Sequence, residues 1–276
     1  MSPLEGPGPV ALVGSGEFLQ VMAPIDAELL EGRPRRAVFL PTAAGEEGPE
    51  RVRYWVELGT THYRAMGVEP VALEVLDRKD AGRPELAAKL AGAGLIYLSG
   101  GNPGYLAHTL AGTPVWEAIL EAWHAGAALA GCSAGACALS RIADDFARPG
   151  HYSGAGLAVV PQLVVLPHFD RLERWRPGLT ETMAGRTPKD AVLVGIDEET
   201  ALVGHGESFI VRGKRSAWRI DRDGTRWQFK AGELFNPSSG APPAAGLPRR
   251  AAQPYADPER NHGQQADRSQ DHPLGR

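Results

Sequence analysis

A serine set between two glycines is the residue of this sequence best suited to covalent chemistry. The segment Gly131-Cys132-Ser133-Ala134-Gly135 has the form G-x-S-x-G. In this pattern a sharp strand-to-helix turn exposes the serine hydroxyl, and small flanking residues relieve the crowding around its strained backbone. Ser133 is therefore our candidate nucleophile for acyl transfer.

The same turn offers a donor for the negative charge that develops on an attacked carbonyl. The N–H of Ala134 lies at the start of a helix that we expect to run to Arg141, so it faces the site. A second donor is expected from the loop Ser99-Gly100-Gly101-Asn102, because paired glycines at a strand end let a backbone N–H point at a ligand. We assign Gly101 as that donor.

A serine is a weak nucleophile until a neighbouring base takes its proton. His168 is favoured as the base because it directly follows the apolar run Leu163–Pro167, at a strand end that feeds a loop. By contrast, His62, His108 and His124 fall in helical patterns, and His262 and His272 lie near the C-terminus. A third group should orient the imidazole, and spacing alone leaves its identity open. The candidate acids are Asp197, Glu198, Glu199, Asp144 and Asp145.

Cys132 is the rival nucleophile, and it defines a second hypothesis, a Cys132-dependent amidase or amidotransferase-like protein. A turn centred on Cys132 would have alanines two residues to either side, whereas a turn centred on Ser133 has glycines there, which fits the steric need better. We therefore expect Cys132 to be buried and inert, and Cys137 to be a small core residue. A non-catalytic small-molecule binding protein is the third hypothesis.

Short apolar runs precede these turns, as expected for strands buried on both faces. They are Val10–Val13, Ala37–Leu40, Val71–Leu76, Leu95–Leu98 and Ala127–Ala130. Helical patterns lie between them, at Glu50–Met66, Pro84–Ala91 and Pro114–Trp123. Alternation of strands and helices predicts an α/β fold with a mostly parallel sheet.

The second half of the chain has a different texture. Short β-like runs follow at Val159–Leu166, Ala191–Ile196, Ala201–Val203, Ser208–Val211 and Ala217–Ile220. We expect them to complete the sheet, with an antiparallel edge. From Pro237 onward, Pro, Ala, Gly and Arg dominate, and such a segment cannot offset its ordering entropy by burying apolar surface. We therefore expect one domain at 8–236 and a disordered tail at 237–276.

Composition narrows the partners. The 276 residues carry a net charge of -4, without the basic excess that nucleic-acid binding requires. No apolar run approaches the roughly 18 residues that suggest a membrane span, and the first residues lack a basic signal region, so we expect a cytoplasmic protein without a membrane partner. Two cysteines and scattered histidines predict neither a disulfide framework nor a metal site, and no cofactor is expected.

Four motifs in order give the chain a family resemblance. They are Gly-Gly-Asn at 100–102, Gly-x-Ser-Ala-Gly-Ala at 131–136, Pro-His-Phe at 167–169 and Gly-Ile-Asp-Glu-x-Thr at 195–200. In this order they resemble the serine peptidases of the dipeptidase E and cyanophycinase group. The resemblance runs from about Val10 to Phe235. It implies a class I glutamine amidotransferase-like (flavodoxin-like) fold, a three-layer sandwich around a mostly parallel central sheet.

The resemblance also implies an activity and roles for residues. It implies a serine hydrolase that cleaves peptide or amide bonds of short peptides, with Ser133 as nucleophile, His168 as base and Glu198 as the acid. Gly100, Asn102, Arg171 and Arg174 are implied in substrate binding, and the two arginines suit a substrate carboxylate.

Two further expectations come from the resemblance. Leu166-Pro167 stands where cyanophycinases carry Asp-Gln, and Pro167 is more similar to dipeptidase E, which removes an N-terminal aspartate. A homodimer is expected by analogy with the group.

Overall fold

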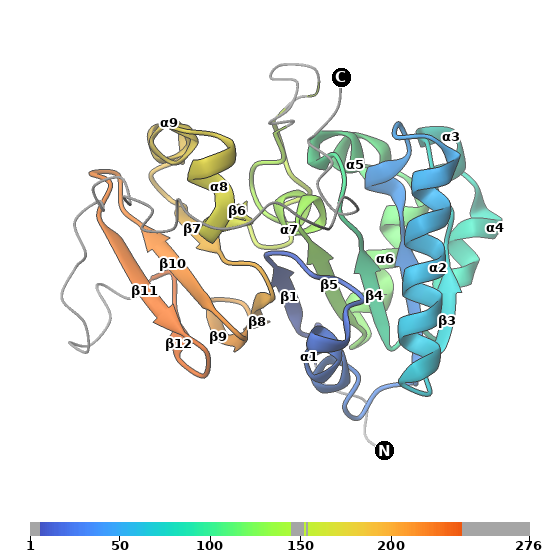
Figure 1. The fold of residues 1–276 in the computed structure, drawn as a ribbon. Coiled ribbons are helices and arrows are strands. Elements are labelled where there is room, and N and C mark those ends of the chain that lie inside the picture. Colours follow the sequence, from blue (N-terminus) through green and yellow to red (C-terminus); the bar gives the residue numbers. More distant parts are fainter. Residues whose placement is uncertain (1–5, 145–151, 153, 239–276) are drawn as a thin grey trace, which may run out of the picture.

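A twisted eight-stranded sheet forms the centre of the molecule (Figure 1). The computed structural model describes residues 6–144, 152 and 154–238. The strands of the central sheet are, in spatial order, β12 (Leu234–Phe235), β9 (Ser208–Gly213), β8 (Thr200–His205), β1 (Val10–Val13), β5 (Ala128–Cys132), β4 (Leu95–Leu98), β2 (Arg36–Leu40) and β3 (Glu69–Ala72). The expected tail, 237–276, lies outside the described residues except at positions 237 and 238.

Helices connect these strands and cover both faces of the sheet. The α-helices are α1 (Ala23–Leu29), α2 (Pro49–Ala65), α3 (Arg78–Ala81), α4 (Pro84–Ala87), α5 (Pro103–Leu110), α6 (Pro114–His124), α7 (Ala134–Leu139), α8 (Phe169–Trp175) and α9 (Leu179–Arg186). Short 3-10 turns are η1 (Gln20–Met22), η2 (Thr42–Ala44) and η3 (Ala88–Leu90). Among the described residues, no helix combines the length and apolarity needed to cross a membrane.

The parallel core of the sheet confirms the predicted α/β class. β1, β5, β4, β2 and β3 run parallel to one another, whereas β8, β9 and β12 add an antiparallel side next to β1. The expected strand Val71–Leu76 is wrong in its bounds, because the ladder pairs Ala72 with Phe39 and β2 ends one residue later, at Leu40. The Leu73 N–H still donates to the Phe39 oxygen at 2.9 Å, but the strand itself ends at Ala72.

A second, four-stranded sheet is the main departure from expectation. Its order is β11 (Arg226–Lys230), β10 (Ser216–Ile220), β7 (Val192–Ile196) and β6 (Leu163–Pro167). The expectation that the later strands all complete one sheet is therefore wrong for β6, β7 and β10. The exposed edge of β1 is taken by the β8–β9 hairpin, and apolar periodicity does not reveal which edge a strand will join.

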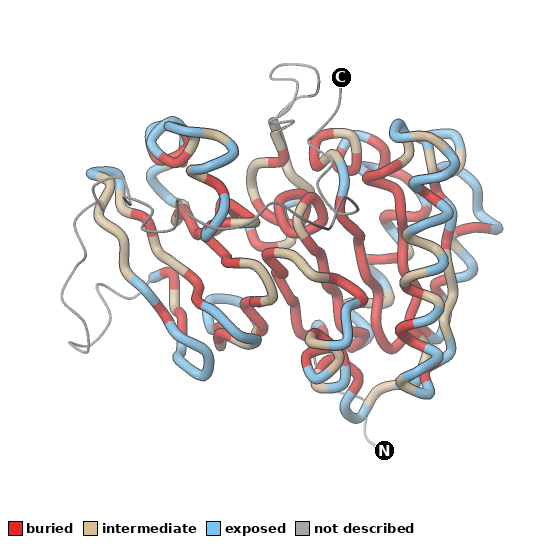
Figure 2. Tube along the Cα trace, in the orientation of Figure 1, coloured by how far each residue is buried: buried red, intermediate tan, exposed pale blue. Residues whose placement is uncertain are grey.

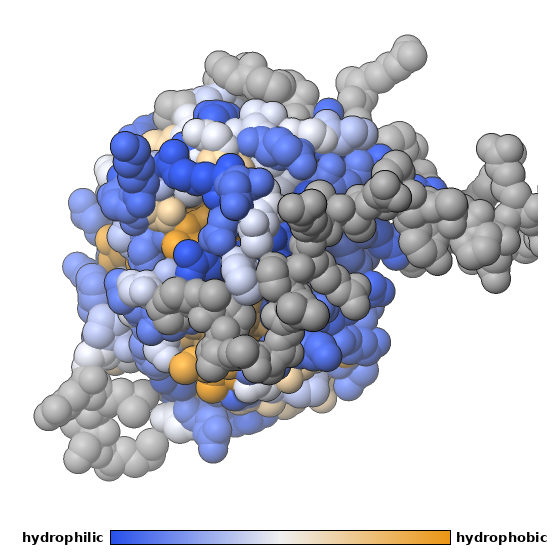
Figure 3. All heavy atoms as spheres, turned by 90° about the vertical axis from the view of Figure 1, so that its left-hand side faces the viewer, coloured by the Kyte–Doolittle hydropathy of each residue, from blue (hydrophilic) through white to orange (hydrophobic). Residues whose placement is uncertain are grey.

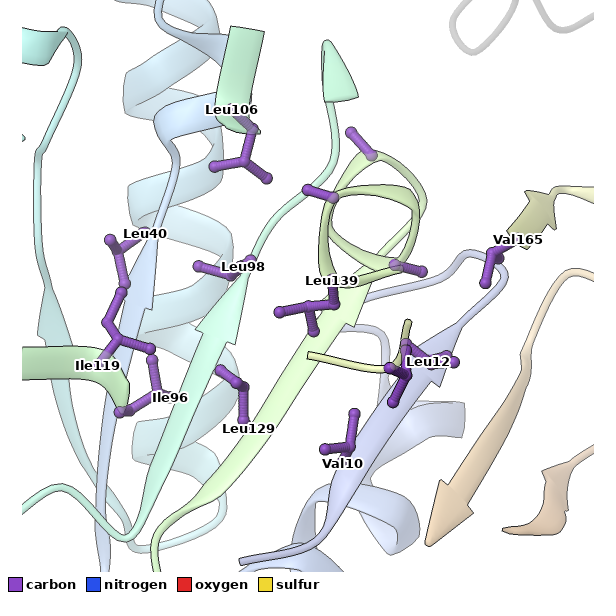
Figure 4. Close-up of a cluster of buried hydrophobic side chains, with 14 of the residues drawn as sticks. Val10, Leu12, Leu40, Ile96, Leu98, Leu106, Ile119, Leu129, Leu139 and Val165 are labelled. Atoms are coloured by element: carbon purple, nitrogen blue, oxygen red, sulfur yellow. The ribbon is translucent and has the colours of Figure 1, made fainter. Parts of the chain in front are cut away.

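Alternating side chains of the central strands build two hydrophobic layers. Leu12, Ile96, Leu98 and Leu129 point to the face covered by α5, α6 and α7, where they meet Leu139 (Figure 4). Their sequence neighbours point to the opposite face, beneath α1 and α2. The strands are buried throughout, whereas α2 presents an exposed outer side (Figure 2). Successive side chains of a strand point to opposite faces, and because both faces are buried here, the sequence of each strand is apolar throughout.

One face of β11, the outer strand of the second sheet, is polar. Along β11, Arg226, Gln228 and Lys230 alternate with Trp227 and Phe229, and only Phe229 is buried. The described surface at this end is accordingly mostly hydrophilic, with small hydrophobic areas (Figure 3). Only this outer strand is polar on that face, because further along the same face Leu166, Leu193 and Ile220 are buried with side chains of α8 and α9.

Strand register determines which chain segments meet. Val13 on β1 pairs with Cys132 on β5, and Leu98 on β4 pairs with Gly131. The carboxyl ends of these three strands therefore lie side by side at one end of the central sheet. In the second sheet, Pro167 on β6 pairs in parallel with Ile196 on β7. The residues after each strand are thereby collected into two neighbouring groups of loops.

Candidate active site

Ser133 lies on a sharp turn between β5 and α7. Its φ of 51° and ψ of -107° place a non-glycine residue in a strained backbone conformation. A Cβ on Gly131 would lie 2.4 Å from the carbonyl carbon of Gly135, and a Cβ on Gly135 would lie 2.2 Å from the oxygen of Leu98. Both flanking glycines are thus sterically required, in the frame centred on Ser133.

His168 reaches this serine from the second sheet. It directly follows β6 and precedes α8, with a φ of 135° that few non-glycine residues adopt. Its Nε2 lies 2.7 Å from the Ser133 Oγ, a hydrogen-bond distance between residues from different sheets. This is the geometry a base needs to take the serine proton.

Glu198 is the described acid that faces the imidazole. Its Oε1 lies 3.6 Å from the His168 Nδ1, longer than a hydrogen bond, and that nitrogen is buried without a hydrogen-bond partner among the described residues. Interaction with His168 foremost, and with the Arg171 guanidinium behind it, holds the pKa of Glu198 below its usual value, against the opposing effect of burial. The carboxylate is therefore charged beside the imidazole.

The other candidate acids have different partners. Asp197 accepts hydrogen bonds from the Ser216 N–H and the Trp218 indole, and burial raises its pKa to about 6, with the Asp170 charge adding to the effect. The remaining two described acids form ion pairs away from the histidine, Glu199 with Lys214 and Asp144 with Arg186. Asp145 lies outside the described residues.

Asp170 ties the histidine segment to the acid segment. It lies in the first turn of α8, two residues after His168, and its Oδ1 accepts the backbone N–H of Glu198 at 3.0 Å. Its Oδ2 lies 2.9 Å from the Arg215 guanidinium. One side chain therefore holds the loop that carries Glu198 against the helix that begins after His168. Sequence reasoning did not identify it.

The glycine loop after β4 lies against the serine. A Cβ on Gly100 would approach the Ser133 Cβ to 3.6 Å. Gly101 has a φ of 140°, and a Cβ there would lie 2.4 Å from the Ala43 oxygen, so glycine is required. Neither the Gly101 N–H nor the Ala134 N–H donates to another described group, which leaves both predicted donors available to a ligand.

The predicted substrate-binding residues have distinct environments. The Gly100 N–H donates to Glu17, and the Asn102 Oδ1 accepts the Tyr105 N–H as the N-cap of α5. Arg171 lies 3.5 Å from Glu198, whereas Arg174 is exposed and has no ion pair with a described residue. Arg174 is therefore the freer of the two guanidinium groups.

Trp175 is a site residue that sequence reasoning missed. Its ring centroid lies 5.5 Å from that of His168, and 51% of the residue is exposed. The available signal was an aromatic residue seven positions after the histidine, two helical turns along α8. An exposed indole beside the base offers apolar contact area to a bound molecule.

Cys132 is not placed to act as a nucleophile. It is fully buried at the end of β5, and its Sγ lies 2.8 Å from the Glu17 Oε2. Burial, with the Glu17 charge adding to it, raises the pKa of the thiol well above its usual value. Burial likewise raises the pKa of Cys137 to about 12.

Among the described residues, no group of His, Cys, Asp or Glu is arranged to hold a metal ion.

We predict that neither thiol reacts with iodoacetamide at pH 8 in the folded protein, because alkylation requires an accessible thiolate. Intact mass should show no adduct in buffer and two adducts after unfolding in guanidinium chloride. Rapid labelling of Cys132 in buffer, as fast as that of a free cysteine, would contradict this assignment.

Comparison with known proteins agrees with this arrangement. The model of peptidase family S51 matches residues 10–212. Cyanophycinase from Trichormus variabilis is 29% identical over 169 residues, covering 58% of this chain and 56% of that protein. Cyanophycinase from Synechococcus elongatus is 30% identical over the same length, covering 52% of that protein. The chain thus aligns with only about half the length of these relatives.

Solved structures extend the match over most of the chain. The crystal structure of a peptidase from an acI-B1 Actinobacterium is 37% identical, with a TM-score of 0.77 over 84% of this chain and 98% of that one. A putative peptidase E from Listeria monocytogenes, 22% identical with a TM-score of 0.57 over 75% of this chain, shares the fold. On the extent of the family match and of this structural likeness, the chain belongs to peptidase family S51.

Proposed function

We propose that this protein is a serine peptidase that hydrolyses peptide or amide bonds of short peptides. The observation that carries the proposal is the 2.7 Å contact between the Ser133 Oγ and the His168 Nε2. It joins a strained, glycine-flanked serine to an imidazole, and Glu198 lies behind that imidazole. Membership in family S51 supports the same chemistry.

In the proposed reaction His168 takes the Ser133 proton as the oxygen attacks the substrate carbonyl. The imidazolium that forms is stabilised by the Glu198 carboxylate and then protonates the leaving amine. Water, deprotonated by the same imidazole, attacks the acyl-serine and releases the acid. Glu198 need close only a small gap to bond the Nδ1–H, and such bonds commonly tighten when substrate is present.

Two backbone donors would stabilise the tetrahedral intermediate. Ala134 is the first residue of α7, so its N–H has no partner within the helix and lies at the positive end of the helix dipole. Gly101 contributes the second N–H from the loop after β4. Donors fixed in advance at the site of developing charge are the usual largest source of rate enhancement in acyl transfer.

The direction of proton transfer assigns a side of the site to each half of the substrate. Because His168 protonates the leaving amine, the residue after the cleaved bond must lie on the histidine side. Trp175 is the exposed aromatic residue there. We propose that its indole contacts the side chain of the leaving residue, and that Arg174 receives a substrate carboxylate.

A homodimeric state and a cytoplasmic location stay predictions from the sequence.

Substituting Ser133→Ala should abolish labelling by a fluorophosphonate probe, because among the described residues Ser133 carries the only hydroxyl that bonds an imidazole. Intact mass of the unmodified protein should show a single adduct, and the variant none. An unchanged adduct in the variant, or full retention of peptide hydrolysis, would overturn the proposal.

Substituting Glu198→Gln should lower kcat by about 10²–10⁴-fold, since loss of the orienting carboxylate leaves the imidazole in the wrong tautomer. The matched control is Glu199→Gln, one residue further on, whose carboxylate pairs with Lys214 and does not contact the histidine. That control should keep kcat within about twofold. Equal losses in the two variants would exclude Glu198 as the orienting acid.

Substituting Trp175→Ala should raise KM for dipeptides with an aromatic second residue by about 2–10-fold, the value of one aromatic contact. Dipeptides with alanine in that position should be nearly unaffected. Tyr54→Ala, which removes another half-exposed aromatic residue from α2, serves as the control. A uniform change across all leaving residues would show that Trp175 does not contact that side chain.

A further inference from the structure

A buried carboxylate lies beneath the glycine loop and has no role in the proton transfers described above. Glu17 follows β1 and is only 6% exposed. Its Oε1 accepts the Gly100 N–H at 2.9 Å, and its Oε2 accepts the Cys132 S–H at 2.8 Å. It forms no ion pair with a described residue. Burying a carboxylate with two neutral donors and no cation is unfavourable, so its position calls for a functional explanation.

The two contacts connect three loops at the edge of the central sheet. Glu17 itself follows β1, Gly100 follows β4, and Cys132 ends β5 directly before the nucleophile. The approach to the loop depends on glycine, since a Cβ on Gly100 would lie 2.8 Å from the Glu17 Oε1. A larger residue at position 100 would therefore displace either the carboxylate or the loop.

The hydrogen bonds around Gly101 show what this carboxylate holds. Glu17 holds the peptide group that joins residues 99 and 100, by accepting the Gly100 N–H. The Ala43 oxygen holds the peptide group that joins residues 101 and 102, by accepting the Asn102 N–H at 2.8 Å. The peptide group between them, which carries the Gly101 N–H, is held on both sides while its own N–H has no partner among the described residues.

We propose that Glu17 is a positioning residue that fixes the orientation of the Gly101 N–H for the oxyanion. This inference rests on the proposed function. Glu17 forms no hydrogen bond with Ser133 or His168, and its hydrogen bonds go to Gly100 and Cys132, so it acts through the loop. The contact with Cys132 holds the second carboxylate oxygen and keeps the side chain aimed at Gly100.

The decisive comparison is between Glu17→Gln and Glu17→Leu. Both substitutions remove the charge and nearly preserve volume, but only glutamine keeps an oxygen that can accept the Gly100 N–H. Glu17→Leu should lower kcat by about 10–100-fold with KM within about twofold, below the roughly 10²–10³-fold that follows complete loss of an oxyanion donor. Glu17→Gln should restore most of that loss. Affinity for a peptide aldehyde, which forms a tetrahedral adduct with the serine, should fall in parallel with kcat.

Thermal unfolding of each variant checks that the fold is retained. If Glu17→Leu does not fold, Glu17→Asp replaces it, because aspartate keeps the charge but is one methylene too short to reach both donors. Glu17→Asp should then lose kcat while Glu17→Gln keeps it. Glu28→Gln is the control, an acid on α1 that pairs with Arg212 outside the site, and it should leave kcat unchanged.

The outcomes separate this inference from the proposed function. Equal kcat in Glu17→Leu and the unmodified enzyme overturns the positioning role while leaving the peptidase intact. Equal losses of kcat in Glu17→Leu and Glu17→Gln also overturn it. So does a kcat that is kept in Glu17→Asp, which retains the charge, but lost in Glu17→Gln, which retains the length of the side chain. Absence of hydrolysis and of a fluorophosphonate adduct in the unmodified protein overturns the proposed function, and the inference with it.

Discussion

The contact between Ser133 and His168 is the constraint on which the arrangement of the molecule depends. Its two residues come from different sheets, so the 2.7 Å distance holds only while the two sheets keep their relative position. That position is set by packing, because residues of the second sheet such as Val165, Val194 and Phe229 join the same hydrophobic cluster as the central strands. A well-packed interior resists the small displacements that would separate the Ser133 hydroxyl from the His168 imidazole.

Unfavourable backbone conformations gather at this contact. Ser133 and His168 both have positive φ angles, and Gly101 has a φ of 140° in a space that admits no Cβ. The two non-glycine residues each cost on the order of 1–3 kcal/mol and persist where surrounding structure holds them, whereas glycine adopts the positive φ at position 101 without that cost. Here the surrounding structure consists of parallel strands that end together. The strain is thereby concentrated at the edge where the chemistry is proposed.

Three acidic residues, Glu198, Asp170 and Glu17, lie around Ser133 and His168 and differ in what they contact. Glu198 lies next to the imidazole, where a cation would form, and Arg171 accompanies it. Asp170 binds the backbone of Glu198 and so links it to the helix that follows the histidine. Glu17 contacts the Gly100 backbone and the Cys132 thiol rather than Ser133 or His168. Each acid thus has its own set of contacts, which its residue type alone does not reveal.

Local sequence was sufficient for the turns and their chemistry. The glycines around Ser133 and at position 101 are required by contacts of a few ångströms within neighbouring turns, and the apolar runs before them predicted β1, β2, β4 and β5. The prediction that His168 pairs with the serine rested on its place at a strand end and on the family resemblance. These features are local in the chain, so periodicity and residue type are enough to find them.

Only the tertiary structure decided the rest. The division into two sheets and the contacts of Glu17, Asp170 and Trp175 depend on residues far apart in sequence. The family resemblance had already implied Glu198 as the acid, and the fold places it beside the imidazole. Spacing could not separate Asp197, Glu198 and Glu199, because consecutive residues after a strand point in different directions, and only packing shows which one faces the imidazole. The sequence by itself determined which residues could react, and the fold determined which of them meet.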